Sequence, residues 1–153
     1  GEHLEVVKYL RYKKCSWDKG ACAKAARHGH LDVLKYLHEN GCPWSSNACS
    51  EAAGQGHLEV LKYLYENGCA WDWNARLEAM KGGHLEVFKY LHKNRCPWIF
   101  GSWECLEAAR YGHLEMLKYM YENIWDCDSN TCLEAIKGGH LKVLRYLHEN
   151  GCY

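Results

Sequence analysis

The sequence predicts an all-α solenoid, an elongated stack of short helical pairs, over residues 1–153. Three observations carry this prediction: a segment that recurs at a nearly constant spacing, helical patterning inside it, and glycines at fixed places beside it. Each copy opens on a histidine, and these are His3, His30, His57, His84, His113 and His140. The spacings are 27, 27, 27, 29 and 27 residues, and a fixed period of this length is the signature of a repeat architecture.

The segment that follows each histidine has the pattern of an amphipathic helix, which we call the second helix of a repeat. In the copy that opens at His57, apolar residues recur at helical spacing from Leu58 to Tyr65, with Val60 on the flank. Glu59 and Lys62 lie three apart on the opposite side, where opposite charges stabilise an exposed helix slightly. A glycine precedes the histidine in five copies, and another ends the helix at Gly41, Gly68 and Gly151, where a left-handed conformation favours glycine.

A shorter helical segment, the first helix of a repeat, comes before each Gly-His pair. Its copies read ACAKAARHG, ACSEAAGQG, ARLEAMKGG, ECLEAARYG and TCLEAIKGG. Two helices of about nine residues leave only short connections within each period, as in tightly packed helical pairs. The sequence therefore predicts eleven helices, six second and five first, in one array with two extra residues in its fourth interval.

The core string A-A-x-x-G-H-L-x-V-L-K-Y-L-x-x-N-G-C resembles the ankyrin repeat, and residues 25–42 and 52–69 carry it best. The resemblance covers the whole chain, and the GCPW string at Gly41–Trp44 is similar to short, Cys/Trp-rich ankyrin repeats. An ankyrin repeat has about 33 residues and a projecting β-turn finger. The shorter period here implies that the fingers are reduced to tight turns. The resemblance implies a protein-interaction role and no enzymatic activity, and it names no partner.

The composition argues against several classes of function. Nineteen basic residues balance nineteen acidic ones, so bulk charge does not favour nucleic-acid binding. No apolar run approaches the roughly 18 residues that a membrane span needs, and no secretory signal pattern opens the chain. We therefore expect an intracellular protein, cytoplasmic or nuclear, with reduced cysteines. The sequence lacks an initial methionine, and we expect it to be part of a longer array.

The ten cysteines fall mostly into two phases of the repeat. One set follows the second helix (Cys15, Cys42, Cys69, Cys96, Cys152) and another lies early in the first helix (Cys22, Cys49, Cys105, Cys132). By the ankyrin resemblance both phases are small core positions. Free cysteine is among the most buried residue types, so core packing is the favoured interpretation, with disulfides and metal binding as alternatives. Their spacing does not match the close ligand pairs of zinc sites, and we expect no metal and no cofactor.

The histidines that open the repeats are expected to form hydrogen bonds between neighbouring repeats. No Ser-His-Asp arrangement, phosphate-binding loop or H-E-x-x-H motif is present, so no catalytic residue is predicted. Trp17, Trp44, Trp71 and Trp98 share one phase at the turns between repeats. We expect them to fill the space left by the missing fingers, because an aromatic at a repeated position more often packs than binds.

The expected partner-binding residues are those that vary between copies on the scaffold. By the resemblance, the ends of the first helices line a concave surface. Basic residues there suggest a binding stripe, but glutamates three residues earlier allow a simpler reading as surface ion pairs. Two aromatic residues lie at the two-residue insertion. The full set is Arg27, Gln55, Trp73, Lys81, Phe100, Trp103, Arg110, Tyr111 and Lys137.

The leading functional hypothesis is a scaffold that binds a protein partner on this concave face, since solenoids provide such surfaces without special chemistry. The alternative is a structural array that assembles head to tail, because neither end of the sequence shows a polar capping repeat.

Overall fold

The computed structural model describes residues 1–97, 103–123 and 127–152, which form eleven helices and no strand. The one helix of the first, partial repeat is α1 (Glu2–Tyr12). The first helices of the following repeats are α2 (Lys19–Arg27), α4 (Ser46–Gly54), α6 (Trp73–Lys81), α8 (Trp103–Arg110) and α10 (Ser129–Lys137). The second helices are α3 (Leu31–Glu39), α5 (Leu58–Glu66), α7 (Leu85–Lys93), α9 (Leu114–Glu122) and α11 (Leu141–Glu149). The predicted all-α solenoid, with six second and five first helices, is confirmed.

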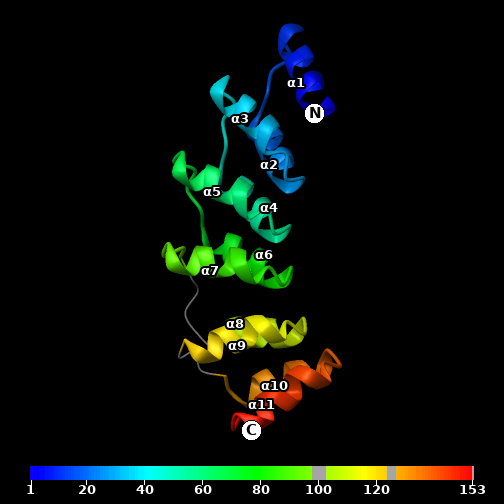
Figure 1. Cartoon of the computed structure of the whole chain (residues 1–153), viewed down its shortest axis with the longest axis vertical. Coiled ribbons are helices and arrows are strands. Elements are labelled where there is room, and N and C mark those ends of the chain that lie inside the picture. The colour runs from blue at the N-terminus through cyan, green and yellow to red at the C-terminus, as the bar shows by residue number, and fades with distance from the viewer. Residues whose placement is uncertain (98–102, 124–126, 153) are drawn as a thin grey trace.

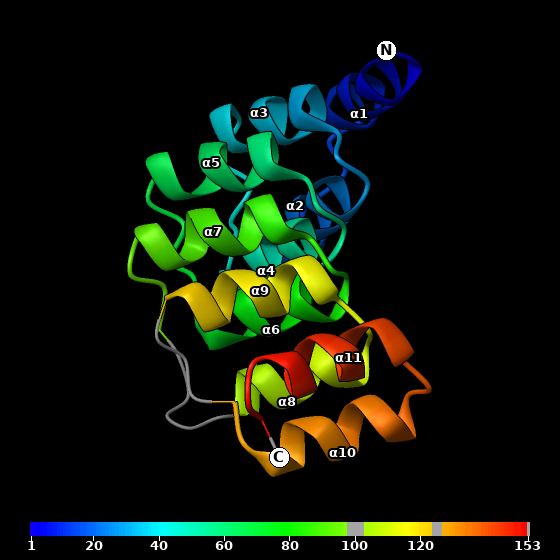
Figure 2. The ribbon, with the colours of Figure 1, turned by 60° about the horizontal axis from the view of Figure 1, so that its bottom comes forward.

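The helices form two layers along the length of the molecule (Figures 1 and 2). Figure 2 shows the second helices stacked as one row, with the first helices as another row beneath them. The first helices of neighbouring repeats are in extensive contact at α2–α4, α4–α6 and α8–α10, whereas neighbouring second helices touch at few points. Because the first helices approach one another more closely, they lie on the inner side of the stack.

Small residues explain this close approach. Ala48, Cys49, Ala52 and Ala53 of α4 are fully buried, and short side chains let two helix backbones come together. The second helices supply the larger core residues, such as Leu61 and Leu64 of α5. Val60, on the flank of the predicted apolar stripe, is also in the core and 3% exposed, whereas Tyr65 of that stripe is 39% exposed.

Local capping fixes where each helix begins and ends. Asp18, Asp72 and Asp128 precede first helices and accept hydrogen bonds from backbone N–H groups of the first turn. An asparagine follows every second helix from α3 onward and donates through its side-chain amide to the carbonyl four residues earlier. Gly41, Gly68 and Gly151 then adopt φ of about +80° (78°, 82° and 80°), as the sequence predicted.

The turns between repeats are filled by aromatic residues. Trp44 stacks on His38 with ring centroids 3.8 Å apart, and Trp71 stacks on Tyr65 at the same distance. Each tryptophan also meets the edge of a tyrosine of the next repeat, Tyr63 or Tyr90. Trp17, Trp44 and Trp71 all pack against the core, so their predicted packing role is confirmed. Trp98 lies outside the described residues.

Candidate functional site

The ends of the five first helices bring the predicted binding residues into one row on the inner side of the stack. Arg27, Lys81, Arg110 and Lys137 are the last residues of α2, α6, α8 and α10. In α4 the last residue is Gly54, and Gln55 follows it. The row therefore holds four cations and one gap. Phe100, also predicted to contact a partner, lies outside the described residues.

A row of glutamates runs beside these cations. Glu78 binds Lys81, with Nζ and Oε1 2.9 Å apart, and Glu134 binds Lys137 at 2.6 Å. Arg110 lies between Glu107 of its own helix and Glu134 of the next repeat, at 3.4 Å and 3.9 Å. The stripe is therefore a ladder of opposite charges, as the surface ion-pair reading expected. Such a ladder still presents both signs of charge to a partner.

The predicted aromatic contacts have different surroundings. Trp73 begins α6 with 40% of its surface exposed, and Tyr111 follows α8 with 41% exposed. Trp103 is instead half-buried and packs against the core. Replacing Trp103 would therefore disturb folding as well as any binding, which makes Tyr111 and Trp73 the cleaner probes of this surface.

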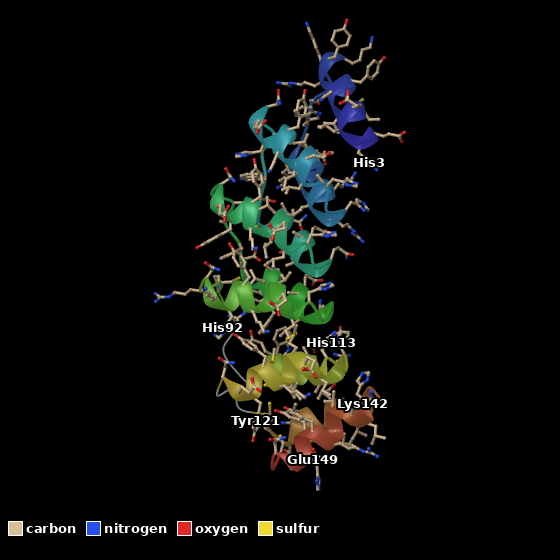
Figure 3. All side chains as sticks on the ribbon, viewed as in Figure 1. His3, His92, His113, Tyr121, Lys142 and Glu149 are labelled. Carbon is tan, nitrogen blue, oxygen red and sulfur yellow. The ribbon has the colours of Figure 1, made fainter. Side chains whose placement is uncertain are left out.

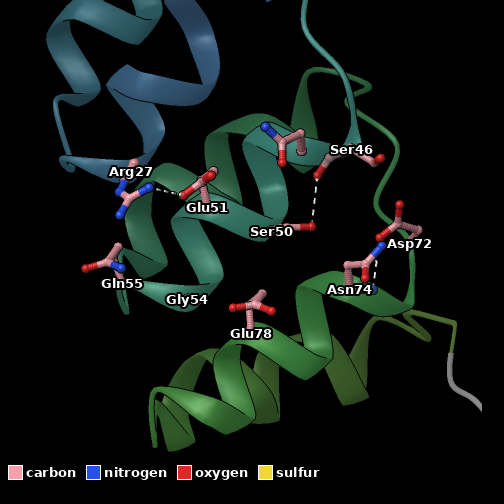
Figure 4. Close-up of a pocket in the computed structure, with 10 residues that line it drawn as sticks. Arg27, Ser46, Ser50, Glu51, Gly54, Gln55, Asp72, Asn74 and Glu78 are labelled. Carbon is pink, nitrogen blue, oxygen red and sulfur yellow. Dashed lines mark hydrogen bonds and ion pairs between the residues drawn. The ribbon is translucent and has the colours of Figure 1, made fainter. Parts of the chain in front are cut away.

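A polar hollow of about 620 Å³ opens at the gap in the row (Figure 4). It extends over α2, α4 and α6, and half of its lining residues belong to α4. Figure 4 shows the side chain of Glu78 between α4 and α6. The residues that line it are Arg27, Ser46, Asn47, Ser50, Glu51, Gly54, Gln55, Asp72, Asn74 and Glu78. Two predicted residues, Arg27 and Gln55, belong to it, and the others were not predicted.

The repeat histidines connect successive repeats. Nε2 of His84 lies 3.1 Å from the carbonyl oxygen of Gly54, and Nε2 of His113 lies 2.9 Å from that of Lys81. His57 and His140 make the equivalent contacts with Arg27 and Arg110, and Figure 3 labels His113 at the start of α9. The predicted hydrogen bonds between repeats are confirmed for these four of the six repeat histidines, whereas the rings of His3 and His30 stack on each other with centroids 4.4 Å apart. The four contacts hold the ends of the first helices in line.

Comparison with known proteins agrees with this architecture. A family model described as ankyrin repeats (3 copies) matches residues 1–72 and 48–131. The chain belongs to the ankyrin repeat family. Among solved structures, the crystal structure of the human ASB11 ankyrin repeat domain superposes with a TM-score of 0.72 at 20% sequence identity. The match covers 86% of this chain and 69% of that chain, and it shows the fold alone. A search of curated proteins finds no match.

Ankyrin repeats generally mediate protein–protein interaction, and the family is typically non-enzymatic. None of the described helices combines the length and apolar character needed to cross a membrane. Within residues 1–97, 103–123 and 127–152, no three His, Cys, Asp or Glu side chains are grouped to hold a metal ion.

In this ankyrin array the cysteines of the second-helix phase link each repeat to its own beginning. The thiols of Cys42, Cys69 and Cys96 donate to the carbonyl oxygens of Asp18, Ser45 and Asp72 over 3.3–3.4 Å. Burial raises the pKa of Cys96 to about 12, which keeps its thiol protonated and unreactive. Seven cysteines are buried, as predicted, but Cys15 is exposed.

The two cysteine phases also meet within a repeat. The thiol of Cys132 donates to the carbonyl oxygen of Cys152 at 3.2 Å, and the thiol of Cys49 donates to the carbonyl oxygen of Cys69 at 4.0 Å. These contacts within a repeat were not predicted from the sequence. The regular separation of 20 residues between Cys22 and Cys42, Cys49 and Cys69, and Cys132 and Cys152 was the available signal.

In the fourth repeat, Arg76 stands where most other first helices carry a cysteine. Its partner is Glu104 in the fifth repeat. Both are buried, and Nε of Arg76 lies 3.5 Å from Oε1 of Glu104. Arg76 also donates from Nη1 to the carbonyl oxygen of Cys96 at 3.2 Å and lies over the ring of Phe88. It therefore takes over the thiol's contact within the repeat and adds an ion pair to the next repeat. The sequence analysis did not predict this contact.

Burial dominates the electrostatics of this pair. It raises the pKa of Glu104 to about 7, against the opposing attraction of Arg76, and it lowers the pKa of Arg76. Neither side chain reaches the surface row, because their exposed fractions are 6% and 4%. The pair therefore belongs to the packing between repeats and not to the candidate site.

Proposed function

We propose that this chain is a scaffold that binds a protein partner on the inner face formed by the ends of its first helices. The observation that supports this most directly is the row from Arg27 to Lys137, in which four repeats of a regular scaffold present a cation and the position after it varies, for example from Gln55 to Tyr111. Binding surfaces of repeat proteins arise in this way, because neighbouring repeats hold each position at a fixed distance from the next. The expected site residues remain Arg27, Gln55, Trp73, Lys81, Phe100, Trp103, Arg110, Tyr111 and Lys137.

The supporting chemistry is mixed charge beside exposed aromatic surface. Tyr and Arg are enriched among residues that dominate binding energies, and Arg110 and Tyr111 are adjacent here. Charged rows steer association and select complementary partners more than they add affinity. We propose a protein partner for this face, with no nucleic acid and no membrane, inside the cell where the buried thiols stay reduced.

The outer face offers a matched control for testing this proposal. Lys62, Lys89 and Lys118 on the second helices each bind a glutamate three residues earlier, at 2.7–2.9 Å. They therefore resemble Lys81, Arg110 and Lys137 in charge and in pairing, but lie on the other layer.

A photo-crosslinking residue placed at Gln55 or Tyr111 is expected to capture a defined protein in cells, while one at Glu59 or Glu115 on the outer layer is not. Replacing Lys81, Arg110 and Lys137 together with Glu should then weaken the affinity for the purified partner by at least roughly tenfold. Reversing Lys62, Lys89 and Lys118 should leave its affinity unchanged. Equal losses from both triple variants would contradict a site on the inner face.

We also propose, as the alternative, a structural array that self-assembles head to tail. The observation that favours it is apolar surface at both ends of the described stack. Val6 of α1 is 58% exposed, and at the other end Ile136 and Leu141 are 60% and 58% exposed. Apolar recesses of about 520 Å³ and 410 Å³ lie beside these residues. Light scattering after size exclusion separates the proposals: growth of the species with concentration supports assembly, and a constant monomer supports the scaffold.

A further inference from the structure

The hollow lies along three small residues on one face of α4, where the neighbouring α6 carries large ones. Ser46, Ser50 and Gly54 are spaced by four residues and therefore lie in line along the helix. The equivalent positions of α6 carry Trp73, Leu77 and Lys81. Large side chains thus fill this line on the next helix, whereas α4 leaves about 620 Å³ open.

The walls of the hollow are acidic. Glu51, Asp72 and Glu78 contribute three negative charges, and Arg27 contributes one positive charge, so the lining carries a formal charge of +1 − 3 = −2. The remaining lining residues are uncharged amides, hydroxyls and Gly54. A cation is therefore the complementary occupant.

One oxygen of each of these three carboxylates already has a partner within the protein. Glu51 Oε2 faces Arg27 at 3.7 Å, Glu78 Oε1 accepts from Lys81 at 2.9 Å, and Asp72 Oδ1 accepts from the backbone of Asn74. The second oxygen of each carboxylate makes no hydrogen bond or ion pair within the described part of the chain. The carboxylates of Glu51 on α4, of Asp72 just before α6 and of Glu78 on α6 thus line one hollow, and Figure 4 labels all three side chains.

We propose that the hollow seats an arginine side chain of an extended partner segment, an inference that rests on the proposed function and names the chemistry of its partner. A guanidinium group is planar and carries five donors in a fixed arrangement, which suits several separate carboxylate oxygens. The volume lies within the range of about 300–1,000 Å³ typical of ligand sites, so it also holds the adjoining peptide backbone. The amides of Asn47, Gln55 and Asn74 provide donors and acceptors for that backbone.

The probe is N-acetyl-arginine amide, titrated into the isotope-labelled protein and followed by amide chemical shifts in NMR. Its matched control is N-acetyl-citrulline amide, which keeps the shape and removes the charge. We expect saturable shifts confined to residues 46–55 and 72–78 for arginine, with at least roughly tenfold weaker binding for citrulline. No shifts, equal binding of the two probes, or shifts spread over outer pairs such as Glu59–Lys62 would overturn the proposal.

Two variants test the same space. Ser50→Leu with Gly54→Lys fills the hollow with the residue types that α6 carries, and it should abolish the arginine shifts. A Cβ at Gly54 would lie 3.1 Å from Cβ of Glu78, so this variant must be checked for folding. Glu78→Gln keeps the backbone and the shape while removing one charge, and it should weaken arginine binding by several-fold. An unaltered affinity in Glu78→Gln would count against the acidic wall.

The same variants separate this inference from the proposed function. A protein captured through Gln55 should bind the filled-hollow variant at least roughly tenfold more weakly if its arginine occupies the site. If that protein binds the inner face with unchanged affinity after the hollow is filled, the scaffold function stands and the inference about arginine fails.

Discussion

The junctions α4–α6 and α6–α8 use the same repeat but are packed differently. At α4–α6, small buried residues such as Ala52 and Ala79 allow extensive helix contact. At α6–α8, where the two-residue insertion falls, the helices are in less extensive contact and the buried pair Arg76–Glu104 bridges them. The histidine hydrogen bond spans both junctions, from His84 to Gly54 and from His113 to Lys81.

This difference shows which parts of a repeat can vary. The contact at the end of the helix stays constant although the two residues that it joins are 30 apart at one junction and 32 apart at the other. The packing along the helices changes instead, from small apolar residues to a charged pair. Breaking one half of that pair should therefore affect only the second junction.

The largest effect is expected from Arg76→Cys, which installs the residue of the other repeats beside a buried glutamate. Removing one partner of a buried pair typically costs about 3–5 kcal/mol, and we expect a loss of that order in urea unfolding at pH 8. Adding Glu104→Ala should restore much of the stability, because no buried charge then remains. If the double variant is less stable than Arg76→Cys, the pair is not the source of the loss.

The second effect is a pH dependence carried by Glu104. Its folded pKa, about 7, lies above the ordinary value of 4.5 for a glutamate, so its contribution to stability is fully present below about pH 4.5. That contribution is lost as the pH rises through about 7, by up to about 3 kcal/mol from the size of the shift. Relative to Glu104→Gln, the wild-type free energy of unfolding should fall over this range. Parallel curves for the two proteins would show that Glu104 titrates normally.

Replacing the glycine before a repeat histidine with alanine should destabilise the protein equally at both junctions. Gly56 and Gly83 have φ of 77° and 71°, and a Cβ there would lie 2.6 Å from the ring of His84 or His113. Alanine adds about 1–2 kcal/mol of backbone strain and displaces a hydrogen bond worth about 1 kcal/mol. Gly68→Ala is the control, since its φ is 82° but no atom lies within 4 Å. In chemical denaturation, Gly68→Ala should lower the free energy of unfolding by about 1 kcal/mol less than Gly56→Ala or Gly83→Ala does.

The smallest effect is expected for the exposed ladder. Arg110 pairs with glutamates of two repeats, but its side chain is 58% exposed, and exposed ion pairs contribute about 1 kcal/mol or less. The free energy of unfolding of Arg110→Ala should therefore lie within about 1 kcal/mol of that of the parent protein. Its affinity for a partner on the inner face should fall. A larger loss of stability would place Arg110 in the packing between repeats, alongside Arg76.

The sequence by itself determined the helices, their order and the left-handed glycines, because these depend on residues close in the chain. It also indicated the histidine contacts, because the histidine recurs once per period. It also placed the row from Arg27 to Lys137 in one phase. Tertiary structure alone decided that Arg76 meets Glu104, that Cys15 is exposed, and that small residues on α4 leave a hollow. A period shows which positions are equivalent, but the rise and rotation between repeats decide which side chains touch.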